Sequence, residues 1–131
     1  MYCLTDTVYA LSSGAGKGGV AVIRVSGKEV KTICRLMAGI ENPKSRYAYF
    51  RPLKGQDGQT IDHALVLFFE GPNSFTGEDV VEFQVHGGQS VITAGYVALS
   101  SFENVRPAEA GGFLRRAVWF GEMDFRQGEG V

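Results

Sequence analysis

Polar side chains interrupt two stretches of this sequence that otherwise suit a protein core. Arg24 lies within the apolar run VAVIRV, and Glu82, Gln84 and His86 alternate with apolar residues in VVEFQVH. A buried guanidinium is costly unless a carboxylate pairs with it. Glu82 or the carboxylate of a ligand could be that partner. The alternative is that Arg24 reaches solvent from the end of its strand.

The polar residues of the second run would lie on one face of a strand, because successive side chains point to opposite faces. There Glu82 could accept two adjacent N–H groups from an amidine-like edge of a ligand. His86 precedes two glycines and could act as a general base, although a single histidine at a strand end is more often structural. His63, beside Asp62, is expected to be exposed. The alternative is that Glu82, Gln84 and His86 form the solvent-exposed face of an ordinary strand.

The elements that would position these residues follow from apolar spacing and turn residues. Strands are predicted at residues 7–11, 20–25, 47–52, 61–69 and 79–86, with a short one from Val105, and helices at 28–37, 90–102 and 112–120. Asp57-Gly58 predicts a hairpin turn, and Gly39 a helix end. The apolar end of 61–69 predicts burial on both faces. This order indicates an α+β fold, a mixed β-sheet with two to three helices.

Length and composition indicate one globular domain of 131 residues, 44% hydrophobic and 21% charged. The net charge of −1 gives no overall field that would attract nucleic acid or an anionic membrane. Cys3 and Cys34 form no metal-binding or disulfide motif. The sequence contains no apolar run of membrane-spanning length, and its N-terminus is not expected to be a signal peptide.

A glycine-rich loop invites a nucleotide-binding interpretation that its context contradicts. Gly14, Gly16 and Gly19 have the dinucleotide-binding spacing, but a strand follows where a helix is required. A P-loop is excluded because Lys17 is followed by Gly18 rather than by serine or threonine. The loop could still offer backbone N–H groups to an anion, or simply connect two strands.

Three longer segments resemble a known family. TVYALSSGAGKGGVAVIRVSG, PNSFTGEDVVEFQVHGG and VRPAEAGGFLRRA are similar to the N-terminal domain of the MnmE/TrmE tRNA modification GTPases. ALSSG and RPAEAG resemble the mitochondrial branch, and the resemblance covers about residues 5–131.

This resemblance implies a domain similar to the tetrahydrofolate-binding domains of one-carbon transfer proteins, which also makes a homodimer. Residues 1–122 would form it, and 123–131 would begin a truncated helical domain. The full-length family, with an MnmG/GidA-type flavoprotein, installs a carboxymethylaminomethyl-type group at C5 of the wobble uridine of tRNA. The carbon donor would be 5-formyl- or 5,10-methylene-tetrahydrofolate. GTP, Mg²⁺ and K⁺ would bind only the absent GTPase domain, so this chain alone is not expected to be catalytic. The expected location is the mitochondrion or a bacterial-type cytoplasm, without membrane attachment.

The family's folate contacts fall on Arg24 and Glu82 of this chain. The third, a lysine in the family, falls on Glu122, and Gly112 stands where the family has a glutamate. A carboxylate at 122 would repel the glutamate tail of a folate, which predicts weaker binding. The alternatives are a purely structural dimerisation module with a degenerate folate site and a small aminomethyl-transfer enzyme acting alone.

Overall fold

The computed structural model describes residues 6–13, 19–72, 74, 76–86 and 88–108, which form six strands and two helices. In chain order the elements are β1 (Thr7–Ser13), β2 (Val20–Ser26), α1 (Val30–Ala38), β3 (Ala48–Lys54), β4 (Thr60–Phe69), β5 (Val80–His86), α2 (Gln89–Ser100) and β6 (Val105–Pro107).

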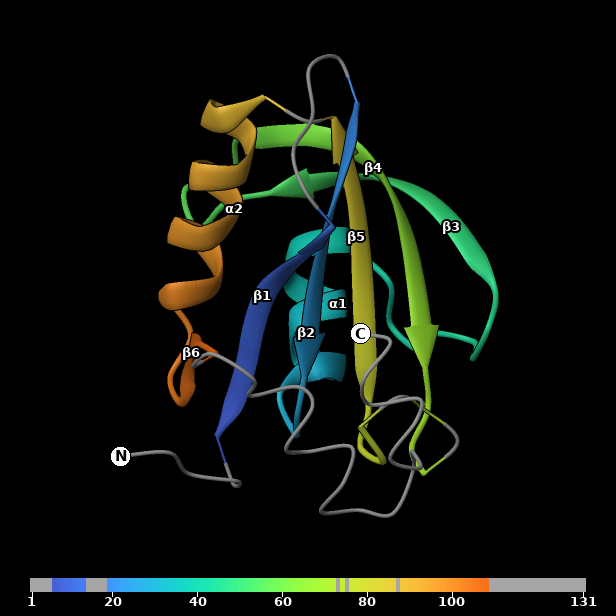
Figure 1. Cartoon of the computed structure of the whole chain (residues 1–131). Coiled ribbons are helices and arrows are strands. Elements are labelled where there is room, and N and C mark those ends of the chain that lie inside the picture. Colours follow the sequence, from blue (N-terminus) through green and yellow to red (C-terminus); the bar gives the residue numbers. More distant parts are fainter. Residues whose placement is uncertain (1–5, 14–18, 73, 75, 87, 109–131) are drawn as a thin grey trace.

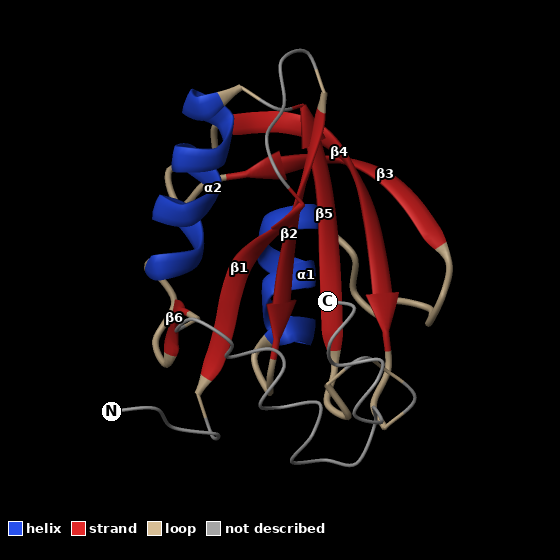
Figure 2. Ribbon diagram, viewed as in Figure 1, coloured by secondary structure: helices blue, strands red, loops and turns tan. Residues whose placement is uncertain are grey.

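The strands form one mixed sheet in the order β3-β4-β5-β2-β1-β6. Every neighbouring pair is antiparallel except β1 and β6, which run parallel. The two strands that carry the polar residues of interest, β2 and β5, therefore lie side by side in the centre of the sheet (Figures 1 and 2). This is the α+β fold that the sequence predicts.

Both helices cover the same face of the sheet, because one core cluster joins them to the strands. Ile33 of α1 and Leu99 of α2 are fully buried in it together with Ile23 of β2 and Phe83 of β5. In Figure 1, α1 is seen behind β2 and β5. The opposite face of these strands is here called the open face, because neither helix covers it.

The predicted elements are found within one or two residues of their expected ends in the described part of the chain. Gly39 ends α1 with φ 69°, and Gly58 has φ 82° in the turn between β3 and β4. Both are backbone conformations that favour glycine. The predicted helix at 112–120 lies outside the described residues.

The prediction that β4 is buried on both faces is wrong. Ala64, Val66 and Phe68 are buried in the core, whereas Leu65 is 40% exposed and Leu67 is half-buried. The apolar run reflects two different environments. One set of alternating side chains meets the helices, and the other lies on the open face.

Candidate functional site

Arg24 and Glu82 form an ion pair in the middle of the open face. They are direct partners across β2 and β5. Arg24 donates from Nη2 and from Nε to the same oxygen, Glu82 Oε2, at 2.7 and 3.0 Å. Their side chains are only 23% and 16% exposed. Of the alternatives for Arg24, the pairing with Glu82 is therefore confirmed, and a guanidinium extended into solvent is wrong.

The pair is set among apolar side chains. On the neighbouring strands, Leu67 of β4 is the partner of Glu82, and Ala10 of β1 is the partner of Arg24. Large hydrophobic side chains with high exposure lie on the same alternating positions, namely Phe50 at 61%, Val20 at 53% and Leu65 at 40%. An apolar surface with a few convergent polar groups is typical of a small-molecule site. This one could hold a flat ring while the ion pair orients its polar edge.

A buried network of hydroxyl groups holds the 71–79 loop against the end of β2. The hydroxyl groups of Ser26 and Thr76 lie 2.6 Å apart, and Ser26 also donates to Glu78 Oε2 at 2.6 Å. Ser26 and Thr76 are fully buried. The backbone N–H of Gly71 donates to Asp79 Oδ1, and a Cβ at Gly71 would lie 2.9 Å from the backbone of Glu78. The sequence alone did not indicate this pairing of the loop with β2.

His86 has a partner that the sequence did not indicate. Asp62, at the start of β4, accepts hydrogen bonds from the backbone N of His86 at 2.8 Å and contacts its Nδ1 at 3.0 Å. Burial alone would raise the pKa of Asp62, but hydrogen bonds from His86 and from the backbone of His63 outweigh it and lower that pKa. His63 is exposed, as predicted.

Several residues singled out in the sequence are not placed. Glu122 and Gly112 lie outside the described residues, and so does most of the glycine-rich loop, with Lys17. Their proximity to Arg24 and Glu82 stays a prediction.

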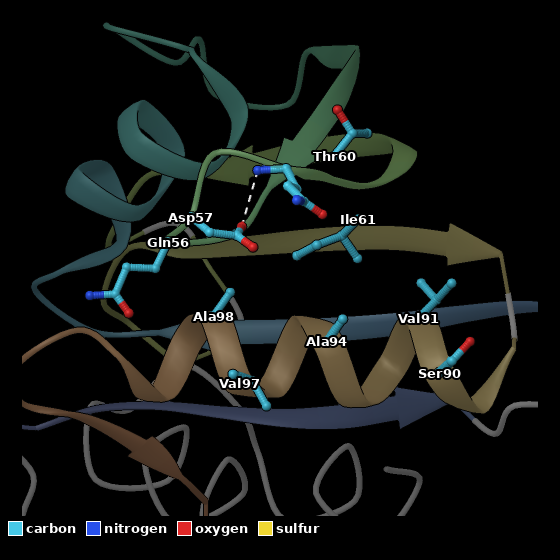
Figure 3. A pocket seen from close by; sticks show the side chains of 11 residues that line it. Gln56, Asp57, Thr60, Ile61, Ser90, Val91, Ala94, Val97 and Ala98 are labelled. Atoms are coloured by element: carbon cyan, nitrogen blue, oxygen red, sulfur yellow. Dashed lines mark hydrogen bonds between the residues drawn. The ribbon is translucent and has the colours of Figure 1, made fainter.

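A cavity of about 750 Å³ lies on the other side of the sheet, between α2 and the turn that joins β3 to β4. Figure 3 shows Val91, Ala94 and Ala98 of α2 facing Ile61 and the turn. Among its described lining residues, Asp57 alone is ionisable, and its Oδ1 already accepts the backbone N–H of Gln59. We place the candidate site at Arg24 and Glu82, because this cavity offers little chemistry beyond hydrophobic contact.

Within the described ranges, no group of three or more histidine, cysteine, aspartate or glutamate side chains could hold a metal ion. Neither described helix is long and apolar enough to cross a membrane. Cys34 is a free thiol in the core, where burial raises its pKa to about 12. Such a thiol is a packing residue rather than a nucleophile.

Comparison with known proteins places this chain in a family. Residues 7–122 match the family model described as "GTP-binding protein TrmE N-terminus". A tRNA modification GTPase MnmE from Dinoroseobacter shibae is 48% identical over 126 residues, covering 96% of this chain and 29% of the relative. The mitochondrial tRNA modification GTPase gtpbp3 of Dictyostelium discoideum is 44% identical over 138 residues, covering 98% and 26%. This chain thus spans less than a third of the length of these relatives, and it belongs to the family of TrmE N-terminal domains.

Proposed function

We propose that this chain is the folate-binding and dimerising part of a tRNA-modifying GTPase. In the whole protein, a flavoprotein partner would share in modifying C5 of the wobble uridine, in a mitochondrion or a bacterial-type cytoplasm. The observation that carries the proposal is the half-buried Arg24–Glu82 pair within the apolar open face.

The pair has the chemistry that a reduced folate requires. The 2-amino edge of a pterin presents two adjacent N–H donors, and a carboxylate can accept both. The two hydrogen bonds from Arg24 end on Oε2, so Oε1 of Glu82 takes no part in them. Arg24 orients the carboxylate, and its guanidinium can donate to a carbonyl oxygen of the same ring. The folate itself would supply the one-carbon unit.

Titration calorimetry with 5-formyltetrahydrofolate tests this proposal. We expect binding to the unmodified chain, and its loss, by about a hundredfold or more, in Glu82→Ala and Arg24→Ala, because each removes charge-assisted hydrogen bonds of about 1.5–3 kcal/mol each. Lys31→Ala is the matched control. Lys31 also pairs with a glutamate, Glu70, but at 3.9 Å and between exposed side chains. Equal affinity in all four proteins would contradict the proposal.

Glu122→Lys tests the predicted effect of the carboxylate at position 122. We expect tighter folate binding in this variant, because a cation replaces an anion near the expected glutamate tail. Heat from Glu122→Lys but none from the unmodified chain would identify a degenerate folate site.

The exposed hydrophobic residues of the open face favour the second role, dimerisation. Phe50 and Leu65 are partners on β3 and β4 and are 61% and 40% exposed. Such a patch is typical of a protein interface. We expect Phe50→Lys to shift the chain from dimer to monomer in light scattering. A dimer that this substitution leaves intact would place the interface elsewhere.

A further inference from the structure

Asp62 and His86 form a carboxylate–imidazole pair where β4 begins and β5 ends. Nδ1 of His86 lies 3.0 and 3.1 Å from the two oxygens of Asp62. The Asp62 side chain is 15% exposed, whereas that of His86 is 74% exposed. The carboxylate is therefore sheltered, and the ring that it holds is open to solvent.

The arrangement fixes which ring nitrogen carries the proton. An ionised carboxylate only accepts hydrogen bonds, so Nδ1 of His86 must be the donor. In the neutral ring, Nε2 is then the basic nitrogen. Among the described residues nothing hydrogen-bonds to Nε2, which leaves it available for a proton from outside. A histidine oriented in this way by a carboxylate is a common arrangement for proton transfer.

His86 also shares a strand face with the folate site proposed above. Strand alternation puts Glu82, Gln84 and His86 on the same side of β5, with Glu82 and His86 separated by about 13 Å between Cα atoms. On β2, the residue directly opposite His86 is the apolar Val20. Among the described residues, Asp62 is the titratable group that contacts the ring, and Glu82 with its partner Arg24 lies further along the face.

We propose that His86 exchanges a proton with the ligand bound at Glu82, and that Asp62 is the positioning residue that keeps Nε2 free for this exchange. The ligand class rests on the proposed function. Nε2 would take up a proton from solvent as the ligand binds and pass it to a basic atom of the ligand, with the N–H electron pair staying on Nε2. The ring is left neutral with its remaining proton on Nδ1, and the reverse transfer restores it.

A purely structural role for Asp62 is the alternative. The last paired residues of β4 and β5 are Leu65 and Gln84, and Asp62 accepts the backbone N–H of His86 just beyond them. This bond would hold the strand ends together whether or not the imidazole moves a proton. The test must therefore keep the bond to Asp62 and remove only the basic nitrogen.

His86→Asn meets this requirement, because an asparagine amide can donate to Asp62 from about the position of Nδ1 but has no counterpart of Nε2. The matched control is His63→Asn at the only other histidine of the chain. Nitrogen NMR of the unliganded chain should show His86 in the Nδ1–H form, and Asp62→Ala should abolish that preference. Calorimetry with 5-formyltetrahydrofolate in buffers of different ionisation heat then measures the protons taken up on binding.

We expect proton uptake on folate binding in the unmodified chain and in His63→Asn, and none in His86→Asn. Affinity in His86→Asn should fall by about tenfold or less, since one hydrogen bond is lost. Folate binding without proton uptake, or with uptake that survives in His86→Asn, overturns this inference and leaves the proposed function standing. No folate binding by the unmodified chain overturns both. An Nε2–H ring in the unliganded chain contradicts the role of Asp62 on its own.

Discussion

The Arg24–Glu82 pair should couple the two central strands energetically, and a double-mutant cycle can measure that coupling. Arg24→Met keeps the aliphatic stem and removes the charge, and Glu82→Gln keeps the shape and removes the carboxylate. Each single substitution leaves one partner of a half-buried pair unsatisfied, which costs more than removing both. The double variant should therefore be more stable than the sum of the two single losses predicts.

The exposure of the two side chains sets the expected magnitude. Ion pairs on the surface contribute about 0.2–1 kcal/mol, whereas breaking a buried pair costs about 3–5 kcal/mol. With 23% and 16% of their side chains exposed, Arg24 and Glu82 lie between these limits. We expect a coupling free energy of about 2 kcal/mol, with a loss of similar size in each single variant.

Urea unfolding at neutral pH measures these free energies. A slope of about 1–3 kcal/mol per molar urea turns a loss of 2 kcal/mol into a midpoint shift of about 1 M. The same cycle on the exposed Lys31–Glu70 pair, 3.9 Å apart, should give about 0.5 kcal/mol or less. If the stability loss of the double variant equals the sum of the two single losses within about 0.5 kcal/mol, the pair does not couple the strands and this reasoning is refuted.

Three further predictions concern the framework of the site. Gly27→Ala should lower the melting temperature by about 10 °C, because Gly27 has φ 144° and an added Cβ would lie 2.4 Å from Thr7 Oγ1; an unchanged thermal scan contradicts this. Because the pKa of Asp62 is lowered in the folded chain, its ionised carboxylate stabilises the fold at pH values above the ordinary carboxyl pKa. This stabilisation is lost as the pH falls through the pKa that Asp62 has in the folded chain. The stability difference between the unmodified chain and Asp62→Asn, from urea midpoints, should therefore shrink in acid, and a constant difference refutes the assignment. Cys34, with a thiol pKa of about 12, should resist iodoacetamide in the native chain and react after unfolding, as followed by peptide mass spectrometry; rapid native labelling would show an accessible thiol.

Most of the elements could be predicted because their signals are local. The β-branched run at Val20–Ser26 and the alternation at Val80–His86 each indicate a strand without reference to the rest of the chain. Gly39 marks the end of α1 through a backbone conformation that it adopts by itself. The one error of burial, in β4, arose because an apolar run does not reveal whether a second layer covers the strand.

The site was predicted in part for the same reason. The cost of burying Arg24 could be recognised from its apolar neighbours, so a carboxylate partner was expected and Glu82 could be named. Asp62 could not be found in this way. It is 24 residues from His86 along the chain, and its role depends on where β4 begins beside the end of β5.

The sequence by itself thus determined the strands, the helices and the need for a charge partner, since propensity, periodicity and desolvation act on neighbouring residues. Only the tertiary structure decided which residues meet. The sheet order brings β2 beside β5, so that Arg24 meets Glu82 although the two residues are 58 positions apart in the sequence. Neither of the two described helices covers the face that carries this pair. Such contacts follow from strand order and register, which no local pattern encodes.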